Sequence, residues 1–216
     1  MPLTAADVAS LSTGVNLLVI SGCLAGAATK SGCGAGYEPS RSNLSYRVLP
    51  LTGAVDGGGL HAQFLALAPG VDVSEVAFDD VLPPARGRAP TVLAKSPPYG
   101  KIVPQAPLAL PFEPTSLAAY AEKGFVVKHS GGELAQSLVE IQTLSSPLTL
   151  PSEFFVFPSN YVLMFMGDPD VPKGSDPGKR LHLVAIPVTN PDSFRDAGAE
   201  GGDAATPTAR DAGGGG

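Results

Sequence analysis

Apolar and polar residues alternate over short stretches in the middle of this chain, a spacing typical of β-strands that bury one face. The stretch from Leu60 to Asp80 holds an apolar strand, a turn at Pro69-Gly70 and a second strand over 71–78 with alternating valines. This pattern predicts a half-buried β-ribbon. We expect the rest of the chain to be organised around it.

Short apolar segments broken by prolines predict further strands on both sides of this ribbon. They cover residues 44–48, 91–94, 101–103, 108–112, 125–128, 138–144, 147–150 and 181–188. The stretch from Asn160 to Met166 is mostly large and apolar, which predicts a strand buried on both faces with 181–188 as its antiparallel partner. The segment before Gly124 predicts either a short helix or a turn, and 133–139 can hold one helical turn.

The pattern as a whole predicts an all-β fold, namely a two-sheet antiparallel β-sandwich, Ig-like or transthyretin-like, with short helical turns at most. We expect the sandwich over residues 44–188, preceded by a lipoprotein signal segment at 1–22 and a flexible linker at 23–43. Residues 189–216 are acidic, rich in Gly and Ala and almost without apolar anchors. We expect them to be disordered, because they bury too little surface to offset the entropy of ordering.

Composition narrows the class of protein further. The 216 residues include 26 Gly and 22 Pro, and prolines spread between short apolar runs favour short strands and fixed turns over long helices. The net charge is −6, and no cluster of four or more basic residues occurs. The sequence therefore predicts no nucleic-acid partner, since such partners require a basic surface.

The apolar run 15–20 is followed by Ser21-Gly22-Cys23, which resembles the lipobox of bacterial lipoproteins, where the cysteine is lipidated and becomes the new N-terminus. The residues before the run include Asp7 and no Lys or Arg, unlike an ordinary signal segment. The alternative is a buried strand with a core cysteine. Cys33 either pairs with Cys23 in an oxidising compartment or stays free while Cys23 is lipidated, and these two outcomes exclude each other.

Two sets of residues are candidate ligands for a metal ion. Asp168, Asp170 and Asp176 offer hard oxygen ligands that suit calcium, although the prolines between them also fit a rigid solvated turn. The three histidines, His61, His129 and His182, can bind a metal only if their strands are neighbours.

Catalytic motifs were sought in the same way. No Gly-x-Ser-x-Gly nucleophile motif and no phosphate-binding glycine loop occurs. We therefore predict no enzymatic activity and no cofactor.

Three segments resemble a bacterial secreted β-sandwich family, the domain of unknown function forty-three ninety-seven. They are Ala68 to Val73, Gly124 to Lys128 with the following Gly131-Gly132, and Tyr161 to Asp168, with Tyr99-Gly100 in the expected interval. The chain departs from the family over 63–66, where the family usually has His-x-Ser-Pro. The resemblance implies a sandwich of the cell envelope and implies no catalytic residue.

The predicted function follows from these observations. We expect a noncatalytic β-sandwich at the bacterial cell envelope, in the periplasm or anchored to the outer membrane through a lipid on Cys23, which acts by surface contact with a protein or a glycan. One alternative is a periplasmic protein that binds a small ligand or a metal through the Asp-rich loop. A less favoured alternative is a secreted hydrolase that uses His129 or His182.

Overall fold

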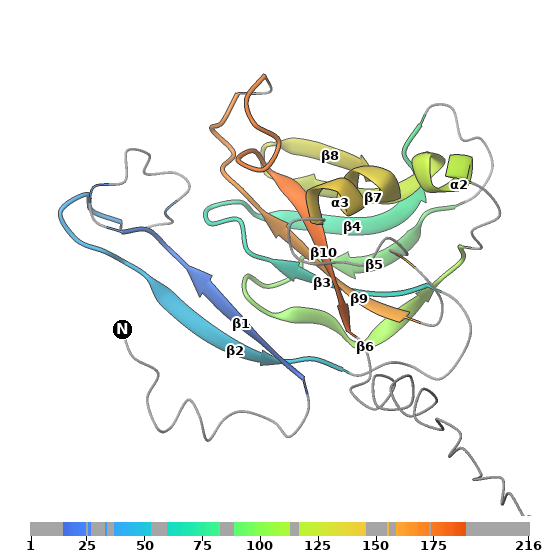
Figure 1. Cartoon of the computed structure of the whole chain (residues 1–216), viewed down its shortest axis with the longest axis horizontal. Helices are drawn as coiled ribbons and strands as arrows, with labels where there is room; N and C mark the ends of the chain where they lie inside the picture. Colours follow the sequence, from blue (N-terminus) through green and yellow to red (C-terminus); the bar gives the residue numbers. More distant parts are fainter. Residues whose placement is uncertain are drawn as a thin grey trace, which may run out of the picture.

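Two four-stranded sheets and a two-stranded ribbon make up the described part of the chain (Figure 1). The structure, a computed structural model, describes residues 15–24, 26, 33, 37–52, 60–82, 89–112, 117–145, 155, 159–172 and 174–188. The ribbon pairs β1 (Asn16–Ser21) with β2 (Ser45–Pro50). The first sheet has the order β10-β9-β3-β6 and consists of β3 (Leu60–Ala66), β6 (Ile102–Leu110), β9 (Ser159–Met166) and β10 (His182–Val188). The second has the order β5-β4-β7-β8 and consists of β4 (Val73–Asp80), β5 (Thr91–Lys95), β7 (Lys123–His129) and β8 (Gly132–Ser137).

The predicted all-β sandwich is confirmed, with one difference in pairing. All neighbouring strands are antiparallel except β3 and β9, which run parallel. Parallel neighbours need a long crossover connection, and the whole second sheet lies between β3 and β9 in the sequence. The helices are α2 (Leu117–Glu122) and α3 (Leu138–Ser145), and none of the described helices is long and apolar enough to cross a membrane.

Aromatic side chains from both sheets fill the space between them. Phe64 and Phe165 stack at 6.4 Å between ring centroids, and Phe78 meets Phe125 edge-on at 5.2 Å. These four rings are almost completely buried and belong to one apolar cluster that joins both sheets. Their burial provides the main hydrophobic stabilisation of the sandwich.

The predicted ribbon over Leu60 to Asp80 is wrong in its pairing. The turn is present, because Gly70 has a φ of +73° and Val71 N donates to Ala68 O at 3.4 Å. The two strands nevertheless enter different sheets, since β3 pairs with β6 and β9 whereas β4 pairs with β5 and β7. Each strand gains two neighbours in this way, which a hairpin alone would not provide.

The strand predicted at 138–144 is instead helix α3, and its first turn explains why. Ser137 Oγ accepts a hydrogen bond from Glu140 N at 3.2 Å, and the Glu140 carboxylate accepts one from Ser137 N at 2.8 Å. This reciprocal pair is a capping box, which begins a helix at this serine. The strand predicted at 160–166 and its antiparallel partner are confirmed. Of the helix and the turn left open before Gly124, the structure contains the helix, α2. The strand predicted at 147–150 and the disordered tail predicted at 189–216 lie outside the described residues.

The segment expected to be a signal and a linker contains folded structure. Residues 16–21 form β1, which pairs along its whole length with β2. The alternation of Leu17 and Val19 toward the protein, with Leu18 and Ile20 away from it, makes this run a two-faced strand. In Figure 1 the ribbon lies beside the two sheets, at the left.

Candidate functional site: a groove beside strand β1

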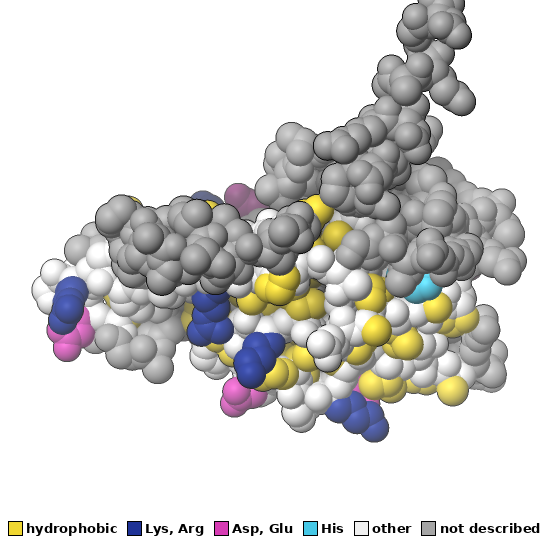
Figure 2. All heavy atoms as spheres, turned by 90° about the horizontal axis from the view of Figure 1, so that it is seen from below, with side chains coloured by type: hydrophobic (Ala, Val, Ile, Leu, Met, Phe, Trp, Pro, Cys, Tyr) yellow, Lys and Arg dark blue, Asp and Glu magenta, His cyan; other side chains and the backbone are white. Residues whose placement is uncertain are grey.

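The outer face of the β10-β9-β3-β6 sheet is apolar except at one end, where Asn160 Nδ2 donates to Gln63 Oε1 at 3.0 Å, and the ribbon covers part of this face. Leu65, Val162 and Val184 are buried on this face and form a second apolar cluster with Val19 of β1. The underside of the molecule carries many hydrophobic side chains and few charged ones (Figure 2). This sheet therefore has apolar side chains on both faces, which normally requires a covering layer on each side.

Among the described residues the cover is incomplete beside β1, where a groove of about 770 Å³ lies. One wall of this β1 groove is formed by residues 17–21 of strand β1, and no residue of β2 lines it. Its floor is made by Leu67, Met164, Met166 and Ile186. Two methionines in such a floor are informative, because their flexible thioethers adapt to different apolar partners.

The end of the groove is formed by a disulfide and by the loop after β9. Cys23 and Cys33 form a disulfide, and both line the groove. Asp168 and Lys179 are the charged residues in its lining. The groove is thus uncharged along β1 and charged only near the loop between β9 and β10.

Asn43 joins the disulfide to the ribbon. Its Oδ1 accepts a hydrogen bond from Cys23 N at 2.7 Å, and its Nδ2 donates to Cys33 O at 2.8 Å. Its own N–H donates to Cys23 O at 3.0 Å, continuing the β1–β2 pairing beyond the strands. One side chain therefore holds both cysteine backbones in place at the end of the groove.

Arg47 of β2 attaches the ribbon to the sandwich. Its Nη1 donates to Tyr99 O at 3.3 Å, and its guanidinium carbon lies 5.4 Å from the centroid of the Tyr99 ring. Gly100 permits this approach, because a Cβ there would overlap the guanidinium. The ribbon is therefore held by polar contacts at its side as well as by apolar packing underneath.

The lipidation predicted at Cys23 is not compatible with this structure. A lipid thioether and the bond to Cys33 need the same sulfur, and here that sulfur is in the disulfide. Of the alternatives open from the sequence, the structure therefore contains the cystine. Removal of residues 1–22 as a signal segment would also delete β1.

The structure does not assemble Asp168, Asp170 and Asp176 as a metal site. Asp168 Oδ1 accepts a hydrogen bond from Asp170 N at 2.9 Å, and Asp176 Oδ1 accepts one from Gly178 N at 3.0 Å. Both carboxylates thus stabilise turns of their own loop, as aspartates often do. Among the described residues, no group of three or more His, Cys, Asp or Glu can hold a metal ion.

The three histidines are also kept apart by the sheet topology. His61 and His182 lie in the first sheet, beside Asn160 and Met166 of β9, which are about 20 Å apart along the strand. His129 belongs to β7 in the second sheet. The predicted condition for a histidine metal site, adjacent strands, is therefore not met.

His129 lines a second, more polar hollow of about 500 Å³, together with Asp72, Ser96 and Ser130. Burial lowers the pKa of His129 below its ordinary value of 6.5. Its Nδ1 accepts a hydrogen bond from Gly131 N at 3.1 Å, so the neutral ring carries its proton on Nε2. Within the described part of the chain, no hydrogen bond joins this ring to a serine or a carboxylate.

The residues of the β1 groove were not recognised as a site from the sequence. The apolar run 15–20 followed by Ser21-Gly22-Cys23 favours a targeting signal, and 160–166 predicts a buried strand. The signal that could have indicated the site is the excess of apolar residues in the strands 160–166 and 181–188. Strands with apolar residues on both faces need a covering layer on each side, and a two-sheet sandwich covers only one.

Comparisons with known proteins add no assignment to this site. A scan of the chain against protein-family models, a search of curated proteins and a search of solved structures each gave no significant match. The resemblance to the secreted β-sandwich family therefore stays a prediction.

Proposed function

We propose that this chain is a noncatalytic β-sandwich of the bacterial cell envelope that acts by contact with another macromolecule, and that the β1 groove is its contact surface. The observation that carries the proposal is the groove itself. It is a concave apolar surface of about 770 Å³ with a floor that includes Met164 and Met166, and such surfaces are typical of binding sites.

The disulfide supports the envelope as the compartment. Disulfides persist in oxidising compartments such as the periplasm and are rare in the cytosol. The Cys23–Cys33 bond forms the end of the groove, so this part of the groove forms as described in a compartment where the bond is stable. The proposal does not include a lipid on Cys23.

The arrangement around His129 supports a noncatalytic role. A general base of a hydrolase needs an unprotonated nitrogen directed at the nucleophile. The neutral His129 ring instead uses its unprotonated Nδ1 to accept the Gly131 N–H. The hollow beside it therefore supports a hydrolase less well than the groove supports binding.

Site-specific cross-linking in the native host tests the contact. A photoreactive amino acid replaces Met166 in the groove floor, and in a matched control it replaces Val92, which is exposed on the other sheet. We expect a cross-linked adduct in the envelope fraction from position 166 and none from position 92. Equal labelling at both positions, or none at 166, would contradict the proposal.

A second measurement tests the compartment. Intact mass of the protein from the native host should lack the two thiol hydrogens, and its thiols should resist alkylation until a reductant is added. Protein recovered from the cytoplasm with both thiols free would contradict the envelope assignment.

A further inference from the structure

The free edge of β1 presents backbone groups without partners. Leu51 N donates to Val15 O at 2.9 Å and Asn43 N donates to Cys23 O at 3.0 Å, which places the odd-numbered residues of β1 in hydrogen bonds with β2. The N–H and C=O groups of Leu18 and Ile20 therefore point away from β2. No hydrogen bond to these groups is present in the part of the chain that the structure describes.

This edge also lacks the features that protect sheet edges in most proteins. Segment 16–21 contains no charge and no proline, and its Leu18 and Ile20 side chains are 48% and 67% exposed. The edge strands of the first sheet differ, because β6 contains Pro104 and Pro107 and β10 contains Pro187. An open apolar edge without charge or proline is a template for pairing with another strand.

The open edge and the apolar floor belong to the same groove, because five of the six residues of β1, all except Asn16, line it and no residue of β2 does. A strand placed beside β1 would direct alternate side chains onto Met164, Met166 and Ile186 and the others toward solvent. It would also give the ribbon a third strand, and two-stranded ribbons are only marginally stable alone.

Charge complementarity restricts what can lie there. The β1 wall and the floor are uncharged, so a charged side chain in the middle of the groove would lose its hydration without gaining a partner. Charged residues of an occupant are tolerated only near Asp168 and Lys179 at the end. The occupant is therefore neutral along β1.

We propose that the β1 groove binds an extended, neutral segment of a partner protein, apolar at alternate residues, which pairs with the free edge of β1. The inference rests on the proposed function and names the class of its partner. A second copy of the chain is a poorer occupant, because the inward side chain of its own β1, Val19, is already buried against its own sheet. Each copy also carries a net charge of −6, which opposes self-association.

Binding of synthetic peptides to the full chain tests the inference. The probe is an end-blocked hexapeptide in which Val alternates with Thr, and two variants carry N-methyl groups either on all Val amides or on all Thr amides. We expect saturable binding by calorimetry, with one methylated variant weakened at least about tenfold and the other little changed, because only one set of amides faces β1. Weaker binding of the peptide with methylated Thr amides indicates antiparallel pairing with β1. Weaker binding of the peptide with methylated Val amides indicates parallel pairing.

A variant of the protein provides the complementary test. Leu18→Pro removes an N–H that faces the free edge and leaves the pairing with β2 intact, whereas Leu18→Val keeps the N–H and serves as control. We expect Leu18→Pro to weaken the unmethylated peptide at least about tenfold and Leu18→Val to change it less than about threefold. Circular dichroism checks that both variants are folded, and the methylated peptides decide the matter if Leu18→Pro is not.

Each of the other outcomes contradicts the inference, and each has a different meaning. Equal binding of all three peptides, or binding of dodecyl maltoside but of no peptide, means that the groove is apolar but adds no strand, and the proposed function survives. Self-association in sedimentation that Leu18→Pro abolishes means that the occupant is a second copy. No binding of any probe, together with no cross-link from position 166, overturns both the inference and the proposed function.

Discussion

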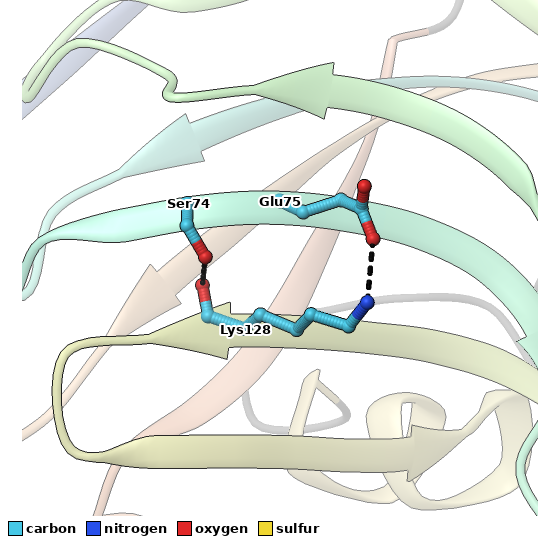
Figure 3. A network of polar contacts seen from close by, with 3 residues as sticks. All are labelled: Ser74, Glu75 and Lys128. Carbon is cyan, nitrogen blue, oxygen red and sulfur yellow. Dashed lines mark hydrogen bonds and ion pairs between the residues drawn. The ribbon is translucent and has the colours of Figure 1, made fainter.

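The two sheets of the sandwich differ in what their outer faces do. On the β5-β4-β7-β8 sheet, Lys128 forms an ion pair with Glu75 at 2.8 Å and Ser74 Oγ donates to Lys128 O, all at the solvent (Figure 3). On the β10-β9-β3-β6 sheet, the corresponding face carries Leu65 and Val162, which are fully buried. The outer face of the β5-β4-β7-β8 sheet is hydrated by solvent. The outer face of the β10-β9-β3-β6 sheet must be covered by protein, and the ribbon covers part of it.

The difference shows that a sandwich can have a fully packed core while one of its apolar outer faces is only partly covered. The face with Glu75 and Lys128 is solvated while the opposite face of the same sheet packs into the core, which is usual for an antiparallel sheet. The apolar face departs from that pattern, and the binding groove lies at the boundary of its cover. The predictions below test this contrast.

A charge on each outer face gives the largest expected difference. Leu65→Asp places a carboxylate where the side chain is fully buried, and we expect it to cost about 3–5 kcal/mol of the free energy of unfolding. Val92→Asp on the other outer face, where the side chain is 37% exposed, should change it by less than about 1 kcal/mol. Urea denaturation measures both, and equal losses would remove the contrast.

Loss of the disulfide should affect the ribbon and spare the sandwich. The Cys23→Ser, Cys33→Ser double variant opens a loop between residues ten positions apart, and we expect a local loss of about 3 kcal/mol. Amide exchange at Val19 should accelerate while exchange at Phe125 in the core stays slow. Equal acceleration at both amides would mean that the ribbon and the sandwich unfold together.

Removal of two methyl groups from each outer face gives a matched pair of smaller effects. Val162→Ala should cost about 2 kcal/mol, because Val162 is fully buried beneath the ribbon side. Val126→Ala, on the outer face of β7, should cost less than about 1 kcal/mol, because Val126 is only half-buried. Thermal and urea unfolding of the two variants measure the difference, and a reversed order would contradict it.

The pKa of His129 predicts a modest dependence of stability on pH. Burial lowers this pKa below 6.5 in the folded protein, so the unfolded chain binds more protons in that range. The free energy of unfolding therefore has its full value above pH 6.5. It decreases as the pH falls from 6.5 through the pKa that His129 has in the folded protein. The His129→Gln variant should lose this contribution, and an NMR titration that gives His129 a pKa above 6.5 would contradict it.

The smallest effect is expected at the ion pair on the solvated face. The hydrogen bond and the charge of Lys128 lower the pKa of Glu75 below 4.5. Any stability from Glu75 is thus present above pH 4.5 and lost as the pH falls through the folded pKa, and solvent screening keeps it small. In Lys128→Gln the pKa of Glu75 should rise toward 4.5, which an NMR titration detects. An unchanged pKa would mean that the pair does not form in solution.

Several parts of the fold were predictable because their signals are local. The strand 160–166 and its partner followed from a run of large apolar residues. The segment before Gly124 left a helix and a turn open, and the structure contains the helix. Helix α3 was predicted as a strand from its apolar content, whereas the capping box at Ser137 indicates a helix. The pairing of Leu60–Asp80 was wrong because a short turn does not determine whether two strands stay in one sheet.

The sequence indicated some of the segments that form the candidate site but not how they are arranged. The apolar run 15–20 was noticed, and a disulfide between Cys23 and Cys33 was one of two alternatives. The choice between a signal and a strand depended on whether β2 lay beside the run, which is a contact between distant residues. The metal hypotheses failed for the same reason, because spacing in sequence did not bring the carboxylates or the histidines together.

By itself, the sequence determined the class of the fold, since alternation at period two and frequent prolines permit short strands and little else. It also indicated that the strand over 160–166 is buried on both faces. Only the tertiary structure decided which strands are neighbours, that the ribbon covers one outer face in part, and that the groove beside β1 stays open. The reason is physical: side-chain alternation is a property of each strand, whereas pairing and cover depend on contacts between residues far apart in the chain.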